Sequence, residues 1–189
     1  MPPVKQVRLD VGTMSKRKKY QELKTTPFET GIRNFTSVAK FFMYYAPGID
    51  SAQSPGDFDA LTSQNLINEM IEVAEMGNRA RFLRKIQPAS WKSVNLENDE
   101  VDFEQPCLLC DKYNQETELH ALLRHMRNAF AHGHLYVWRK VKKGDYIFLV
   151  DFEARRGGEI QKISAKIMIS LSILEKWRAI IENQIAIGE

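Results

Sequence analysis

The stretch 116–132 constrains the fold of this chain most, because it contains neither glycine nor proline and is followed at once by Gly133. At about 100° per residue, its apolar side chains fall within a sector of roughly 100°. They are Leu119, Leu122, Leu123, Met126 and Phe130. A glycine directly after a helix favours the left-handed conformation of a C-terminal cap. The pattern therefore predicts a helix over residues 116–132 that packs its apolar face into a core.

The remaining surface of this helix is rich in cations and imidazoles. On one flank lie His120, Arg124 and Arg127, and on the other lie His125, Asn128 and His132. An exposed helical face usually mixes Glu and Lys, which pair along the helix, but no carboxylate follows Glu118 before Gly133. An anionic partner would stabilise such a face. The alternative is that Arg and His near a helix C-terminus only satisfy free carbonyl groups.

Arg127 and His132 are suited to chemistry on a phosphodiester. Arginine can hold a phosphate with paired donors, and histidine can move a proton near neutral pH. The two residues lie five positions apart, which is roughly 140° around a helix. One rigid helix would not bring them to the same small target, whereas two copies related by a two-fold axis could. We therefore expect each chain to supply half of a site.

The string LLRHMRNAFAHG, residues 122–133, resembles the motif of the HEPN superfamily of prokaryotic ribonucleases and their relatives. That motif places Arg, often a polar residue such as Asn, and then His near the end of a helix, which here are Arg127, Asn128 and His132. The resemblance covers residues 116–184. It implies a helical bundle that dimerises so that two Arg/His motifs line one cleft. The activity that it implies is metal-independent RNA cleavage by a toxin or phage-defence effector.

The resemblance also implies roles for individual residues and partners. Arg127 and His132 would be catalytic and Asn128 supporting. Some toxin relatives carry a tyrosine two residues after the histidine, which a partner nucleotidyltransferase modifies, but here that position is His134. The implied partners are RNA, a second copy bound through the motif helix and, for a toxin, a cognate antitoxin. Because some relatives only bind RNA or nucleotides, a non-catalytic binding module stays open, as does a structural dimerisation domain.

The expected mechanism is attack by the 2′-hydroxyl on the adjacent phosphate. His132 would take the hydroxyl proton, and a second donor, such as the His132 of a second copy, would protonate the leaving 5′-oxygen. Arg127 would stabilise the charge that develops on the phosphoryl oxygens. Further candidates for RNA contact are basic side chains on the helix and in a later loop. They are Arg124, His120, His125, Arg155 and Arg156.

Composition adds weaker constraints. A hydrophobic content of 43% with ten phenylalanines is typical of a folded globule, and a net charge of +3 permits an anionic partner without demanding one. No apolar run approaches the roughly 18 residues of a membrane span. The first residues lack the apolar stretch of a secretory signal. We therefore expect a cytoplasmic protein with no membrane partner and no cofactor.

Cys107 and Cys110 form a C-x-x-C pair. A structural zinc site usually needs four ligands, often supplied by two such pairs, and the chain has only one. We therefore expect no metal and place the two thiols in a loop before the motif helix. The alternative is a site completed by His120 or His125.

The remaining pattern predicts a mainly α fold, a HEPN-like bundle of four to five helices over residues 28–189. Further helices are expected over residues 28–46, 61–85 and 164–184, the last with Ser164 as its N-cap. Strands over 135–141 and 146–152 predict a small β-hairpin between the motif helix and the C-terminal helix. Residues 87–114 look irregular.

Residues 1–27 precede this domain as a basic N-terminal arm. They contain seven basic and two acidic residues. Such an arm could trail along a phosphate backbone. The alternative is a solvated tail, in part ordered as a short edge strand.

Overall fold

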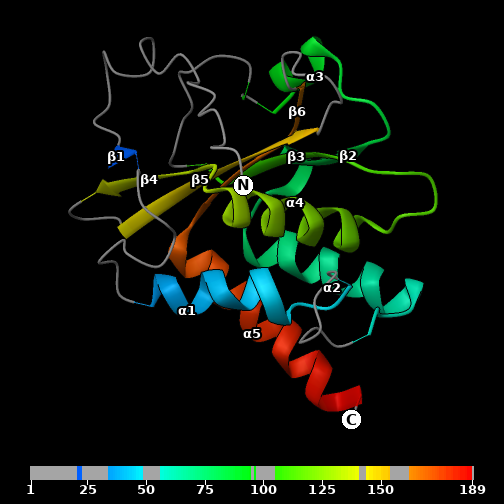
Figure 1. The fold of residues 1–189 in the computed structure, drawn as a ribbon. Helices are drawn as coiled ribbons and strands as arrows, with labels where there is room; N and C mark the ends of the chain where they lie inside the picture. Colours follow the sequence, from blue (N-terminus) through cyan, green and yellow to red (C-terminus); the bar gives the residue numbers. More distant parts are fainter. Residues whose placement is uncertain are drawn as a thin grey trace, which may run out of the picture.

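A mixed β-sheet with helices on both sides forms the protein (Figure 1). The computed structural model describes residues 21–22, 34–48, 56–94, 96, 105–140, 144–153 and 162–188. The helices are α1 (Phe35–Lys40), continued by the π-helical segment η2 (Phe41–Tyr45), α2 (Ala60–Val73), the 3₁₀ turn η3 (Gly77–Arg79), α3 (Pro88–Lys92), α4 (Glu118–His132) and α5 (Leu171–Gly188). The strands are β1 (Gln21–Glu22), β2 (Ala80–Leu83), β3 (Cys107–Asp111), β4 (Leu135–Lys140), β5 (Gly144–Glu153) and β6 (Lys162–Ser170).

The sheet has six strands in the order β1-β4-β5-β6-β3-β2. All neighbouring strands are antiparallel except β2 and β3, which are parallel. This sheet overturns the predicted mainly α bundle with a small hairpin. The predicted hairpin is present as β4 and β5, but it is one part of a larger sheet.

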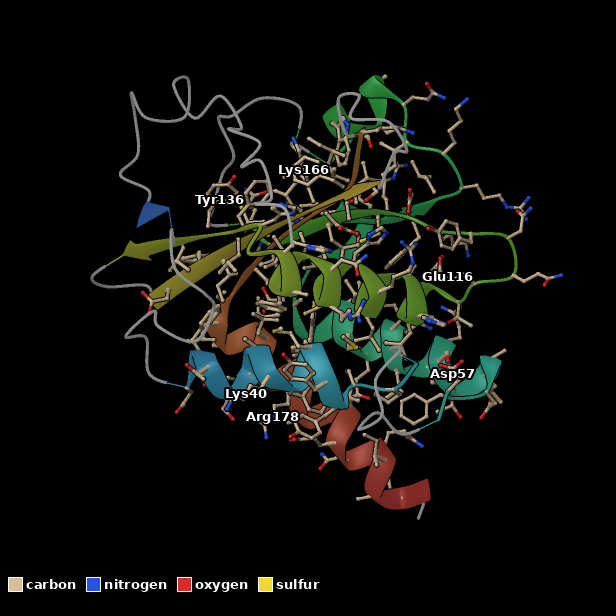
Figure 2. The ribbon with its side chains drawn as sticks, viewed as in Figure 1. Lys40, Asp57, Glu116, Tyr136, Lys166 and Arg178 are labelled. Carbon is tan, nitrogen blue, oxygen red and sulfur yellow. The ribbon has the colours of Figure 1, made fainter. Side chains whose placement is uncertain are left out.

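The central strands bury side chains on both faces of the sheet. On β5, Ile147 and Leu149 contact the helical core, whereas Phe148 and Val150 contact a second, smaller core. The second core is closed by the segment around α3, and Figure 2 shows Lys166 of β6 on that side of the sheet. Strands that are buried on both faces lose the alternation of apolar and polar residues by which a strand is usually recognised.

Helix α4 lies between the sheet and the helices α1 and α2 (Figure 1). Its Phe130 ring packs against Phe35 and Phe42, with ring centroids 6.1 and 6.5 Å apart. In the outer layer, the indole of Trp177 on α5 donates a hydrogen bond of 2.7 Å to the carbonyl oxygen of Met70 on α2. The motif helix is therefore held from two sides, and its two ends reach the surface.

The predicted motif helix is confirmed as α4. The Thr117 hydroxyl oxygen caps its first turn by accepting from the backbone N–H of His120 at 3.2 Å. Gly133 ends the helix with a φ of 69°, in the left-handed region that a glycine adopts without strain. The two predicted strands are also confirmed, as β4 and β5.

The helix predicted over residues 61–85 is wrong beyond Val73. The backbone adopts positive φ at Glu75 and Gly77, which ends the helical path. Residues 80–83 then form β2, the parallel neighbour of β3. The described part of residues 87–114 also contains regular structure that the sequence did not indicate, namely α3 and β3.

The predicted start of the final helix is wrong too. Ser164 is not an N-cap but lies within β6, and α5 begins only at Leu171. Ala165, Ile167 and Ile169 contact the helical core, whereas Met168 between them contacts the second core, as β-strand periodicity requires. Ile167 also lies at helical spacing from Leu171 and Leu174, so the sequence pattern of the strand runs into that of the helix. The predicted helix therefore starts too early.

Two predictions lie outside the described residues. One is the RNA contact of Arg155 and Arg156, and the other is the basic N-terminal arm. Of that arm, only Gln21–Glu22 is described, and it pairs with β4 as the strand β1. Among the helices that are described, none combines the length and the apolar character that a membrane span requires.

Candidate functional site

His125 is the centre of a buried polar network between α4 and the sheet. Its side chain is 0% exposed. Its Nδ1 lies 2.7 Å from Oδ2 of Asp151 on β5, and its Nε2 lies 2.9 Å from the carbonyl oxygen and 3.0 Å from Oδ1 of Asp111 on β3. Burial opposes the charged form of His125, but the hydrogen bonds to Asp111 and Asp151 outweigh it, so the pKa of His125 is raised above its usual value.

The protonation of His125 should make stability depend on pH. Because the pKa is higher in the folded than in the unfolded state, the stabilisation is fully present below about pH 6.5 and is lost as the pH rises through the folded value. We expect the difference in free energy of unfolding between the wild type and His125→Gln to fall as the pH is raised from about 5 to 9. Urea unfolding of both proteins at several pH values measures this difference in free energy. A difference that grows with pH would contradict a charged His125.

Asp151 joins this network to the motif. Its Oδ2 also accepts from Nδ2 of Asn128 at 3.2 Å, and its Oδ1 accepts from the backbone N–H of Phe152 at 2.9 Å. The register between β5 and β6 shifts between Asp151 and Phe152. Such bulges often redirect a side chain. Nη1 of Arg127 in turn donates to Oδ1 of Asn128 at 3.4 Å. Asn128 therefore links Arg127 to a carboxylate that the sheet holds in place.

Arg124 is neutralised by acids from outside the helix. Its Nε donates to Glu116 at 2.8 Å, its Nη2 lies 3.3 Å from Oδ1 of Asp111, and its guanidinium lies over the Tyr113 ring at 4.3 Å from the centroid. Figure 2 shows Glu116 near the start of α4. The expectation that this helical surface lacks acids is therefore wrong. RNA contact by Arg124 or His125 stays a prediction, and RNA would have to compete with these ion pairs.

His132 lies on the surface at the end of α4, beside a second histidine. It is exposed, and its ring centroid is 5.8 Å from that of His134. The backbone N–H of His134 donates to the carbonyl of Ala129 at 2.9 Å, and its carbonyl accepts from the N–H of Val150 at 3.0 Å. The helix cap and the first bond of β4 to β5 thus place the two imidazoles together. A catalytic role for His134 was not among the expectations from the sequence, although two histidines flanking a glycine after a helix are a visible signal.

The motif residues form two groups in one chain. Arg127, Asn128 and Asp151 are linked by hydrogen bonds, and His132 is paired with His134. Within the described part of the chain, no hydrogen bond or ring contact joins Arg127 to His132. The geometry is compatible with the expected half-site, while dimerisation stays a prediction.

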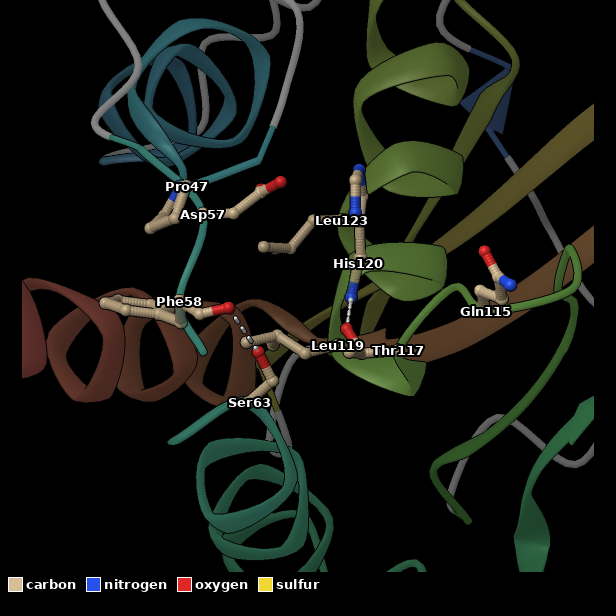
Figure 3. A pocket seen from close by; sticks show the side chains of 9 residues that line it. All are labelled: Pro47, Asp57, Phe58, Ser63, Gln115, Thr117, Leu119, His120 and Leu123. Atoms are coloured by element: carbon tan, nitrogen blue, oxygen red, sulfur yellow. Dashed lines mark hydrogen bonds between the residues drawn. The ribbon is translucent and has the colours of Figure 1, made fainter. Parts of the chain in front are cut away.

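His120 lies at the opposite end of α4, twelve residues from His132, or about 18 Å along the helix axis. It lines a half-open pocket of about 160 Å³ between α4, α2 and the end of η2 (Figure 3). Phe58 and Leu123 supply apolar wall, and Asp57 supplies a carboxylate. The structure therefore does not bring His120 to the motif, and its RNA contact stays a prediction.

The two cysteines do not form a common site. They lie on β3 and not in a loop, and their odd spacing puts Cys107 in the second core and Cys110 in the helical core. Burial raises the pKa of the Cys110 thiol well above its usual value, which suppresses the reactive thiolate. Among the residues that the structure describes, no three His, Cys, Asp or Glu side chains are arranged to hold a metal ion.

Comparison with known proteins identifies the family. No curated protein and no solved structure matches. A family model described as HEPN pEK499 p136 matches residues 60–186, which include α2, the whole sheet except β1, and α4 with its Arg127–His132 motif. Since this match covers most of the 189 residues, the chain belongs to the HEPN pEK499 p136 family.

Proposed function

We propose that this protein is a metal-independent endoribonuclease whose active site lies at the end of α4. The observation that carries the proposal is the placement of His132, which is exposed at the end of α4, on the same helix as Arg127 and Asn128. The carboxylate of Asp151 accepts a hydrogen bond from Asn128, and Asn128 accepts one from Arg127. Membership of a HEPN family supports a nuclease-like or RNA-related module. An enzyme of this kind would act as a toxin or as a phage-defence effector.

The reaction that suits these groups is internal transfer of the phosphoryl group. The 2′-oxygen of a ribose attacks the adjacent phosphorus, and the bond to the 5′-oxygen breaks. His132 transfers one of the protons involved, and Arg127 stabilises the charge on the non-bridging oxygens. Asn128 is a positioning residue, because it orients Arg127 through its bond to Nη1. The products are a 2′,3′-cyclic phosphate and a 5′-hydroxyl.

The complete site requires two copies of α4. Arg127 and His132 leave the helix on different flanks, so one phosphate meets both when a second helix approaches about a two-fold axis. Each dimer then holds two sites, each with Arg127 from one chain and His132 from the other.

Co-expression of Arg127→Ala and His132→Ala chains tests the activity and the shared site together. Each variant alone should keep at most about 1% of the wild-type rate of cleavage of total RNA in EDTA. Their mixture should recover about one quarter of wild-type activity, because half of the dimers are mixed and each mixed dimer has one intact site of two. A mixture as inactive as its components would contradict the shared site.

The same assay separates the proposed function from its alternative. Products of the wild type should carry 2′,3′-cyclic phosphate ends, and the reaction should persist in EDTA. Binding of RNA without cleavage by the wild type would instead favour a non-catalytic RNA-binding module. Cleavage that survives both single substitutions would exclude these residues as the catalytic groups.

A further inference from the structure

His134 is held beside His132 by the backbone and by packing. The left-handed turn at Gly133 and the bonds of His134 to Ala129 and Val150 fix where its side chain starts. Its ring then packs edge-on against the Phe152 ring, with centroids 4.8 Å apart. The two histidine rings are tilted by 32° at a centroid distance of 5.8 Å. This arrangement is preorganised, because both residues belong to the junction between α4 and β4.

The Nδ1 atom of His134 is buried and has no hydrogen-bond partner among the described residues. A buried polar atom without a partner is unfavourable, and a catalytic role is one of the explanations for such an atom in a native protein. His134 as a whole is partly exposed, and its ring lies beside that of His132. His134 is therefore positioned for function more clearly than for stability.

The charged neighbours of His134 come from both elements packed against it. Burial lowers the pKa of His134, the adjacent His132 at the end of α4 lowers it further, and Asp151 on β5 acts in the opposite direction with a smaller effect. His134 is therefore neutral at neutral pH and able to accept a proton.

We propose that His134 is a second catalytic residue of the ribonuclease site, where it takes the proton of the 2′-hydroxyl while His132 donates a proton to the leaving 5′-oxygen. This inference rests on the proposed function and assigns the two proton transfers within it. The bond from the 2′-oxygen to phosphorus forms as the bond from phosphorus to the 5′-oxygen breaks. One proton enters His134 and one leaves His132, and exchange with water restores both rings. A second copy then needs to contribute only Arg127.

The separation of the His132 and His134 rings suits one proton transfer by each ring. A proton-transfer group must lie roughly 2.6–3.2 Å from the oxygen that it serves. In an in-line displacement, the attacking and leaving oxygens lie on opposite sides of phosphorus. Two rings whose centroids are 5.8 Å apart can therefore each face one of these oxygens. Two imidazoles in direct hydrogen-bond contact would instead leave no room for the phosphate.

Two substrates with different leaving groups test the assignment. On an RNA oligonucleotide, His134→Ala and His132→Ala should each lower kcat/KM by about 10²–10⁴-fold. On ribonucleoside 3′-(4-nitrophenyl phosphates), assayed with all four bases, the leaving phenolate needs no proton. There, His132→Ala should recover to within about tenfold of the wild type, whereas His134→Ala should keep its full loss. The pH profile of kcat/KM should lose its acidic limb in His134→Ala, and free imidazole should restore part of the activity.

His134→Gln keeps a polar side chain, and the backbone bonds do not depend on the ring, so thermal unfolding of both His134 variants shows whether each folds. If His134→Ala cleaves RNA as the wild type does while His132→Ala does not, this inference fails and the proposed function stands. If the activated substrate rescues His134→Ala and not His132→Ala, the assigned roles are overturned. If the folded wild type cleaves neither substrate, the proposed function fails, and this inference with it.

Discussion

Replacement of His132 by alanine is expected to lower the rate of RNA cleavage by about 10²–10⁴-fold, the usual contribution of one proton-transfer group. The loss should appear in kcat, because the imidazole acts in the transition state and adds little to the binding of the ground state. His132 is exposed at the end of α4, so its removal should change the free energy of unfolding by less than about 0.5 kcal/mol. Initial rates in EDTA and thermal unfolding measure the two quantities.

His120→Ala is the matched control, since it removes the same side chain from the other end of the same helix. If His120 contributes only a distant contact to RNA, the control should change KM and leave kcat near the wild-type value. A fall in kcat as large as that of His132→Ala would show that histidines of α4 act through a general effect on the helix. It would remove the case for His132 as the proton-transfer group.

Replacement of Asp151 by alanine is expected to lower the free energy of unfolding by about 3–5 kcal/mol, because it breaks a buried ion pair and leaves His125 without one of its two carboxylates. The side chain of Asp151 is only 4% exposed and accepts from both His125 and Asn128. Denaturation in urea, with midpoint and slope compared with the wild type, measures the loss. Asn128 is released at the same time, so cleavage should fall even where the variant is folded.

Asp57→Ala serves as the control for this prediction, because Asp57 is an exposed aspartate at the rim of the pocket near His120. It should change the free energy of unfolding by less than about 0.5 kcal/mol. A loss below about 1 kcal/mol for Asp151→Ala would mean that His125 is buried neutral and not held as a cation. The pH dependence expected for His125→Gln would then disappear as well.

The sequence was sufficient to predict those elements whose pattern is local. The apolar stripe from Leu119 to Phe130 and the glycine after His132 act within a few residues, and α4 with its cap follows from them. The strands β4 and β5 are likewise local, because each is a short run of residues that pairs with the next one along the chain. The sheet around them depends on pairings between distant segments. Strand β2 has only four residues and pairs with β3, which lies more than 20 residues later in the sequence. Four residues are too few for their pattern to distinguish a strand from the end of a helix.

The candidate site was predictable to the same extent. The rotation of about 100° per residue places Arg127, Asn128 and His132 outside the apolar stripe of α4. It contains no information on which side chains of the sheet lie against that part of the helix. Asp151 lies 23 residues after Asn128 and becomes its partner because β5 packs against α4. The sequence for this reason indicates an RNA contact for His125, whereas the carboxylates of Asp111 and Asp151 hold its ring in the structure.

The placement of α4 between two layers limits how the motif can change by insertion or deletion. Phe130 is fixed in the core between Arg127 and His132, so an extra residue between the two would rotate everything after it by about 100° and shift it by about 1.5 Å. Either the aromatic ring would leave its position, or His132 would turn away from His134. The spacing of the motif is therefore set by the packing of one helix.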